Sequence, residues 1–164
     1  MVGVNNMKMC VTGHRPNKLY GYDLTDDRWI ALKEDFKQIL IENKCDEAIT
    51  GMALGVDTIF AYAVLELKED GHDIKLHCAV PCRNFSGKWN IYDRVKYRNI
   101  ISLADTVKLV SDEEYKPYLM QKRNEYMVDH SDKVIAVWDG SKSGTKNCID
   151  YAKKVGKDII FVQP

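Results

Sequence analysis

The chain has 164 residues, of which 45% are hydrophobic and 29% charged, and its 24 Lys and Arg residues balance 24 Asp and Glu residues. This length predicts a single domain over residues 1–164, and the composition is that of a globular protein and not of a disordered one. The net charge of zero excludes strong attraction of the whole molecule to nucleic acid or acidic lipid, but it leaves room for a local basic face.

The cellular location follows from what the sequence lacks. Its first eight residues do not show the charged and then apolar pattern of a secretory signal. No stretch approaches the roughly 20 apolar residues that a membrane span needs. Five cysteines without an export signal are typical of reduced thiols. We therefore expect a cytoplasmic protein with no membrane partner.

The first expected strand covers residues 8–12, and the first helix follows it. Thr25 is expected to cap this helix, with Asp26 and Asp27 at its positive end and Trp29 and Phe36 in its apolar stripe. From there, short apolar runs alternate with helical periodicity. The later strands are expected at 47–50, 74–80, 106–110, 133–138 and 159–162, and the later helices at 56–71, 88–103, 117–130 and 144–155.

This alternation extends from one end of the chain to the other. Several of the strands are nearly continuous apolar runs, as expected where helices cover both faces of a sheet. The pattern predicts a single-domain, doubly wound, mostly parallel α/β sheet.

Glycines and polar residues recur where the expected strands end, which is the edge of such a sheet that binds ligands. Gly51 and Gly55 flank the start of one helix, and residues 143–145 open another. Unpaired N–H groups at a helix start attract anions, so both segments are candidate phosphate cradles. The candidate ligand-binding residues at this edge are Gly13, His14, Arg15, Gly51, Gly55, Asp57, Asp139, Gly140, Ser143, Gly144 and Thr145.

Two side chains give this edge the chemistry of a nucleotide site. Arg15 would neutralise phosphate, and Asp57 would accept hydrogen bonds from ribose hydroxyls. His14 would bind phosphate, act as an acid–base group or serve as a hydrogen-bonded loop residue. Neither loop matches the Walker lysine pattern or Gly-x-Gly-x-x-Gly, and the alternative is that the glycines are turn residues and Asp57 a cap. Their shared edge favours a ligand site.

The segments VTGHRP, GMALGVD, RNEYMVDHSDKVIAVWDG and SGTKN resemble the SLOG superfamily, and most closely its YpsA-like branch, found in bacteria and their prophages. The resemblance covers nearly the whole chain in the expected order. It implies a Rossmann-like fold that binds nucleotides or nucleotide-derived ligands. The superfamily also includes cytokinin-activating phosphoribohydrolases and the DNA-processing protein that loads single strands.

The resemblance also implies roles for individual positions. The phosphoribohydrolases carry a glutamate that contributes to their glycosidic chemistry, and Cys148 stands at that position here, which weakens the case for the same activity. Arg123 and Asn124 resemble a polar pair before the fifth strand that would face the ligand. The matching residues of the two loops are Gly13, Gly51, Gly55, Asp57, Asp139, Gly140, Ser143, Gly144 and Thr145.

Residues 83–98 interleave cations with aromatic side chains. This pattern is typical either of a nucleic-acid surface or of an amphipathic helix whose rings are buried. Trp89 or Tyr92 would alternatively stack on a nucleotide base near the end of the third strand. Cys78 and Cys82 lack a second ligand pair at suitable spacing, so we expect no metal site.

The main hypothesis is a binding protein for a nucleotide or an ADP-ribose-like derivative, acting as a sensor or regulatory module without a required cofactor. One alternative is an N-glycosidase, which needs an acid near the ribose. The other is a single-stranded DNA-binding protein that uses Arg94 and Arg98. The sequence does not identify the ligand, and a homo-oligomer is possible. The acids available to the glycosidase are Asp57, Glu125, Asp129 and Asp139.

Overall fold

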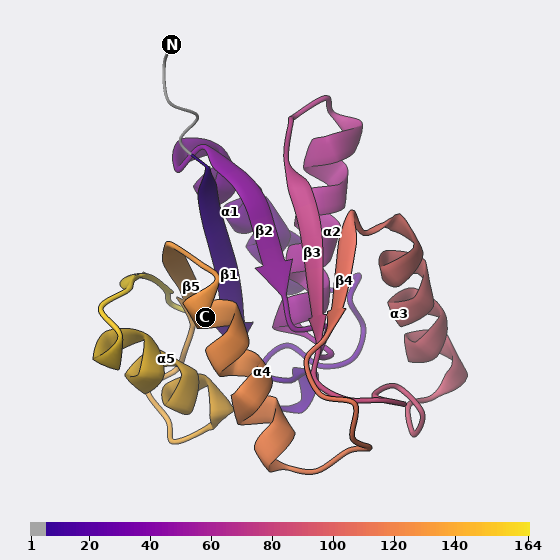
Figure 1. Cartoon of the computed structure of the whole chain (residues 1–164). Coiled ribbons are helices and arrows are strands. Elements are labelled where there is room, and N and C mark those ends of the chain that lie inside the picture. The colour runs from indigo at the N-terminus through magenta and orange to yellow at the C-terminus, as the bar shows by residue number, and fades with distance from the viewer. Residues whose placement is uncertain (1–5) are drawn as a thin grey trace.

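A computed structural model describes residues 6–164, which form one six-stranded, all-parallel sheet with five α-helices (Figure 1). The expected doubly wound α/β class is confirmed. The start of the chain, where we expect no secretory signal, lies mostly outside the described residues. Within them, no helix is long and apolar enough to cross a bilayer.

The elements follow one another in the expected alternation. The strands are β1 (Met7–Gly13), β2 (Cys45–Thr50), β3 (Lys75–Val80), β4 (Thr106–Leu109), β5 (Lys133–Val137) and β6 (Asp158–Val162). The helices are α1 (Asp27–Glu42), α2 (Val56–Glu69), α3 (Ile91–Leu103), α4 (Tyr118–Asp129) and α5 (Gly144–Lys154), with a short 3-10 turn at Pro16–Lys18.

The order of strands places a topological switch point in the middle of the sheet. The order is β4-β3-β2-β1-β5-β6, so the chain moves outward from β1 to β4 and then returns to the other side of β1. The winding direction therefore reverses between β1 and β5. In open parallel sheets, a crevice forms outside the carboxyl ends of the two strands at such a reversal.

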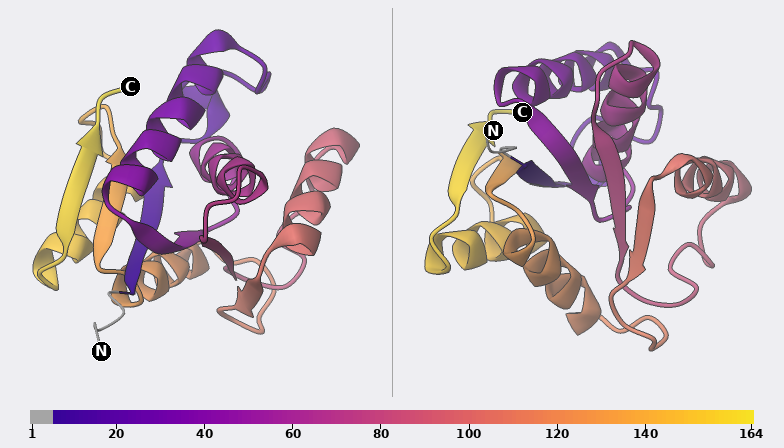
Figure 2. Two further views of the ribbon diagram at one scale, coloured as in Figure 1. Left: turned by 90° about the horizontal axis from the view of Figure 1, so that it is seen from above. Right: turned by 45° about the horizontal axis from the view of Figure 1, so that its top comes forward.

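Helices α1 and α2 cover one face of the sheet, and α4 and α5 cover the other (Figure 2). The core under α1 and α2 is the larger and contains Trp29, Phe36 and Phe60, all fully buried. A smaller cluster under α4 and α5 includes Cys10 and Cys148. All five cysteines are free and buried, so the core and not a disulfide network holds the sheet together.

Three local expectations need correction. Asp26, not Thr25, caps α1, because its carboxylate accepts the N–H of Arg28 at 2.9 Å. Helix α3 begins at Ile91 and not at residue 88, because Asn90 caps it by accepting the N–H of Asp93. All of β4 is exposed, so the expectation that helices cover both faces does not hold at that edge of the sheet.

Candidate functional site

The loops that follow β1 and β5 meet at one cavity beside the switch point. This cavity has a volume of about 380 Å³, and we call it the switch-point cavity. Asp57 from α2 and Thr145 from α5 both line it, so the early and late parts of the predicted site converge. The other predicted residues among its lining are Gly13, His14, Arg15, Arg123, Asn124, Ser143 and Gly144.

The start of α5 presents backbone donors to this cavity. Ser143 is the N-cap: its hydroxyl accepts the N–H of Lys146 at 3.3 Å, and its carbonyl accepts the N–H of Asn147 at 3.1 Å. Within residues 6–164, no hydrogen bond occupies the N–H groups of Gly144 and Thr145. These two donors and the positive end of the helix dipole therefore favour an anion here.

His14 and Asp139 connect the two loops. The Nε2 atom of buried His14 accepts the N–H of Asp139 at 3.3 Å and lies 3.2 Å from its carboxylate. The same carboxylate accepts the N–H of Ser141 at 2.9 Å, which closes a turn before α5. The hydrogen bonds from Ser141 hold the pKa of Asp139 below its usual range. Asp139 and Gly140 do not line the cavity, whereas Ser143, Gly144 and Thr145 do, so Asp139 and Gly140 shape the loop before α5.

Asp57 and Arg123 form the buried, charged floor of the switch-point cavity. Asp57 accepts the N–H of Ala53 at 3.1 Å, and Arg123 donates to the Gly51 carbonyl and, at 3.0 Å, to the side-chain oxygen of Asn124. Burial raises the pKa of Asp57, although the charges of Arg123 and Arg15 oppose this shift. Burial likewise lowers the pKa of Arg123. Burying these two charged groups away from water therefore costs free energy. Hydrogen bonds from a polar ligand would offset part of that cost.

Gly51 and Gly55 support the cavity without lining it. A Cβ atom at Gly51 would lie 2.7 Å from the Arg123 guanidinium, so glycine makes room for that side chain. Gly55 has φ +86° and lies just before α2, where a Cβ atom would be 2.9 Å from the His14 carbonyl. Both glycines therefore fit the alternative of turn and packing residues.

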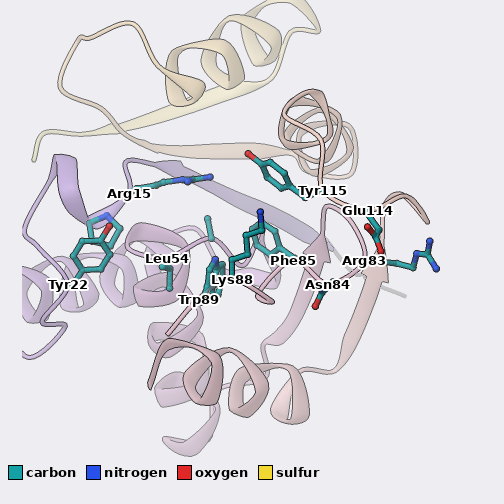
Figure 3. Close-up of a pocket in the computed structure, with 12 residues that line it drawn as sticks. Arg15, Tyr22, Leu54, Arg83, Asn84, Phe85, Lys88, Trp89, Glu114 and Tyr115 are labelled. Atoms are coloured by element: carbon teal, nitrogen blue, oxygen red, sulfur yellow. The ribbon is translucent and has the colours of Figure 1, made fainter. Parts of the chain in front are cut away.

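A second cavity of about 500 Å³ adjoins the first and shares Arg15 and Ala53 with it. We call it the aromatic cavity because four rings line it. Figure 3 shows Arg15 and Lys88 ending over the same space, while Arg83 points away. Its lining comprises Arg15, Pro16, Tyr22, Ala53, Leu54, Arg83, Asn84, Phe85, Lys88, Trp89, Glu114 and Tyr115.

The structure separates the two candidate stacking residues. Trp89 lines the aromatic cavity and packs edge-to-face on Phe85, with ring centroids 5.2 Å apart. Tyr92 is 77% exposed on α3 and lines neither cavity. Arg94 and Arg98 of the same helix also lie outside both linings, so the basic residues of α3 are not part of this site.

Of the four acids considered for glycosidic chemistry, only Asp57 lines either of the two cavities. Asp129 instead accepts a hydrogen bond from Tyr151 at 2.7 Å, and Glu125 lies outside both linings. Cys148 is fully buried in the core under α4 and α5, and this burial raises the pKa of its thiol to about 11.

Sequence reasoning missed Tyr22 and Tyr115 of the aromatic cavity. Both are exposed loop residues, so no periodicity marks them. The available signal is positional: Tyr115 follows β4, whose carboxyl end lies at the same edge of the sheet as the ends of β1 and β3.

The comparisons with known proteins agree with this architecture. A family model described as the YspA SLOG family matches residues 9–159. The chain belongs to the YspA SLOG family. The SPbeta prophage-derived protein YoqJ of Bacillus subtilis is 39% identical over 139 residues, which cover 78% of this chain and 80% of YoqJ. The UPF0398 protein of Ligilactobacillus salivarius is 31% identical over 150 residues, covering 88% of this chain and 81% of that protein. The SLOG resemblance of the sequence motifs is thus confirmed.

Solved structures show the same fold in more distant proteins. DNA processing protein A (DprA) from Streptococcus pneumoniae superposes on this SLOG chain with a TM-score of 0.68 at 15% identity, covering 97% of this chain and 51% of that one. The Helicobacter pylori DprA, described with its single-stranded DNA binding mode, gives 0.66 at 21% identity, with 96% and 66% coverage. The SLOG chain thus spans about half of the pneumococcal protein.

Proposed function

We propose that this protein binds a nucleotide or a nucleotide derivative through its phosphates in the switch-point cavity, as a sensor or regulatory module. The observation that carries the proposal is convergence: the free N–H groups of Gly144 and Thr145, the cation Arg15 and the buried Asp57 line one cavity although they lie far apart in the sequence. Backbone donors and a cation suit phosphate, and a carboxylate suits ribose hydroxyls.

A substitution at Gly144 tests the role of the helix start with little disturbance to the fold. Gly144 is the first residue of α5, where proline is well tolerated, and a Cβ atom there meets no atom within 4 Å. The preceding Ser143 is already extended, as a residue before proline must be (φ −169°, ψ 176°). Gly144→Pro therefore removes one N–H donor and keeps the helix, whereas Gly144→Ala keeps the donor.

We expect Gly144→Ala to bind ADP like the wild type in titration calorimetry. Gly144→Pro should bind about tenfold or more weakly, because one hydrogen bond to a charged group contributes about 1.5–3 kcal/mol. Equal affinity of the two variants, or no binding of ADP by the wild type, contradicts the proposal.

Single-stranded nucleic acid is the second candidate. It is favoured by the aromatic cavity, whose lining combines aromatic rings with cations, and by the likeness in fold to a protein described with a single-stranded DNA binding mode. This function predicts that affinity for a deoxythymidine decamer falls steeply with salt, and that Lys88→Ala weakens it. If the decamer does not bind at low salt, this candidate fails.

A further inference from the structure

We propose that the ligand is a dinucleotide, in which two nucleosides are joined through a phosphate chain, and that its second nucleoside lies in the aromatic cavity. This inference rests on the proposed function and extends it from a phosphate site to a class of ligand. It assigns Trp89 and Lys88 as specificity-determining residues.

The first argument is the arrangement of the two cavities. They share Arg15 and Ala53, so they adjoin, and the Arg15 side chain stands at their junction. Their volumes are about 380 and 500 Å³. Each volume lies within the range of about 300–1,000 Å³ that is typical of a complete ligand site. A mononucleotide would therefore leave one cavity empty, whereas a dinucleotide would occupy both.

The second argument is the chemistry of the aromatic cavity. Phe85 and Trp89 form one wall, and Tyr115 lies across from them (Figure 3). Trp89 packs edge-to-face on both Phe85 and Tyr97, with ring centroids 5.2 and 5.5 Å away. A ring fixed by neighbouring rings is a preformed stacking surface, which loses little entropy when a base packs on it.

The third argument is charge. Within residues 6–164, neither Arg15 nor Lys88 forms an ion pair, whereas Arg83 lies 3.6 Å from Asp112. The side chains of Arg15 and Lys88 end over the same space, and Glu114 lies toward Arg83 at its far side (Figure 3). Two unpaired cations beside aromatic rings suit a planar group attached to phosphate.

Together these features give one path for the ligand. Its first ribose lies near Asp57, its phosphate chain passes from the start of α5 to Arg15, and its second base stacks on Trp89 beside Lys88. The ribose, phosphate chain and second base of a dinucleotide thus follow one another in the same order as Asp57, Arg15 and Trp89 along the two cavities.

The experiment compares ADP with diadenosine diphosphate by titration calorimetry. Both probes carry two phosphates, and the second carries an additional adenosine and less negative charge. We expect diadenosine diphosphate to bind wild-type protein about tenfold more tightly, since stacking of one base contributes about 1–3 kcal/mol. If net charge alone decided affinity, ADP would bind more tightly than diadenosine diphosphate.

Variants test whether the aromatic cavity causes the tighter binding of diadenosine diphosphate. In Trp89→Leu, the advantage of diadenosine diphosphate should fall to within about twofold, whereas Trp89→Phe keeps a ring and should retain most of it. Because Trp89 also packs on its neighbours, Lys88→Ala provides a second test at an exposed position and should reduce the advantage several-fold. Lys153→Ala removes an exposed lysine of α5 outside both linings and should change nothing.

The outcomes separate this inference from the function on which it rests. If ADP binds and diadenosine diphosphate binds no more tightly, or if its advantage survives both Trp89→Leu and Lys88→Ala, the dinucleotide inference is overturned and the phosphate site stands. If neither probe binds, the proposed function fails and this inference fails with it. If a deoxythymidine decamer binds more tightly than diadenosine diphosphate, the cleft recognises a strand and not a free dinucleotide.

Discussion

Asp57 shows how burial and charge compete at the scale of one residue. Its carboxylate lies in the floor of the switch-point cavity, where loss of water opposes its negative charge more than Arg123 and the Ala53 N–H favour it. The consequence is a carboxyl group that is costly to ionise in the folded protein. A ligand that donates hydrogen bonds to the carboxylate would relieve this cost, which ties the stability of the fold to occupancy of the site.

The difference in stability between the wild type and Asp57→Asn should depend on pH and so reveal the cost of ionising Asp57. An acid whose pKa is higher in the folded than in the unfolded chain binds more protons when folded, so stability falls as pH rises from the unfolded value, about 3.9, through the raised folded value. We therefore expect the unfolding free energy of the wild type, minus that of Asp57→Asn, to decrease over this window in urea titrations between pH 4 and pH 7. A difference that instead grows with pH would mean that Arg123 stabilises the anion more than burial penalises it.

The element scale shows what the sequence predicts well and what it does not. Apolar runs locate all six strands, and in the central strands the reason is that a parallel strand covered on both faces must be apolar. The edge strand β4 was located although it is exposed. Helix starts are harder to predict, because several polar residues compete for each cap. At α1, Thr25 uses its hydroxyl to donate to Asp23 at 2.6 Å, and Asp26 takes the cap.

A pair of substitutions tests this assignment of the cap. Asp26→Ala removes the acceptor for the Arg28 N–H and should lower the melting temperature by about 2–4 °C, whereas Thr25→Ala should have a smaller effect. The bonds from Arg28 lower the pKa of Asp26 to about 2, so the carboxylate contributes above the unfolded pKa of about 3.9. The effect of Asp26→Ala should therefore shrink as pH falls from about 4 toward 2. A larger loss for Thr25→Ala at pH 7 contradicts the assignment.

The candidate site also divides into a part that the sequence predicts well and a part that it does not. The half at the switch-point cavity was predictable, because Gly13–Arg15 and Ser143–Thr145 directly follow expected strands or open expected helices, and carboxyl ends of parallel strands share one edge. In the aromatic half, the segment 83–98 and Arg15 were singled out by the sequence, whereas Tyr22 and Tyr115 were not. The contribution of Tyr115 depends on how the loop after β4 packs beside the loop after β3, where the Glu113 carbonyl accepts the Arg83 N–H at 2.9 Å. Such contacts between loops leave no periodic signal in the sequence.

At the scale of the whole molecule, the reversal of winding between β1 and β5 explains why one ligand would affect distant segments. The β1 loop, the start of α2 and the start of α5 are separated by long stretches of sequence, yet all three line the switch-point cavity. The hydrogen bond between the Asp139 N–H and His14 connects two of these segments directly. A molecule bound in the cavity would therefore order them as one unit.

Hydrogen exchange measures this directly. With ADP at about 100 times its dissociation constant, binding stabilises the folded state by about 2.7 kcal/mol, and the amides that contact the ligand gain further local protection. We expect slower exchange together in residues 13–18, 53–57 and 143–147 of the wild type and of Gly144→Ala. In Gly144→Pro at the same ADP concentration, protection should decrease in all three segments and not only near the substitution, because they share one ligand. Protection confined to a single segment would show that the cavity does not act as one site.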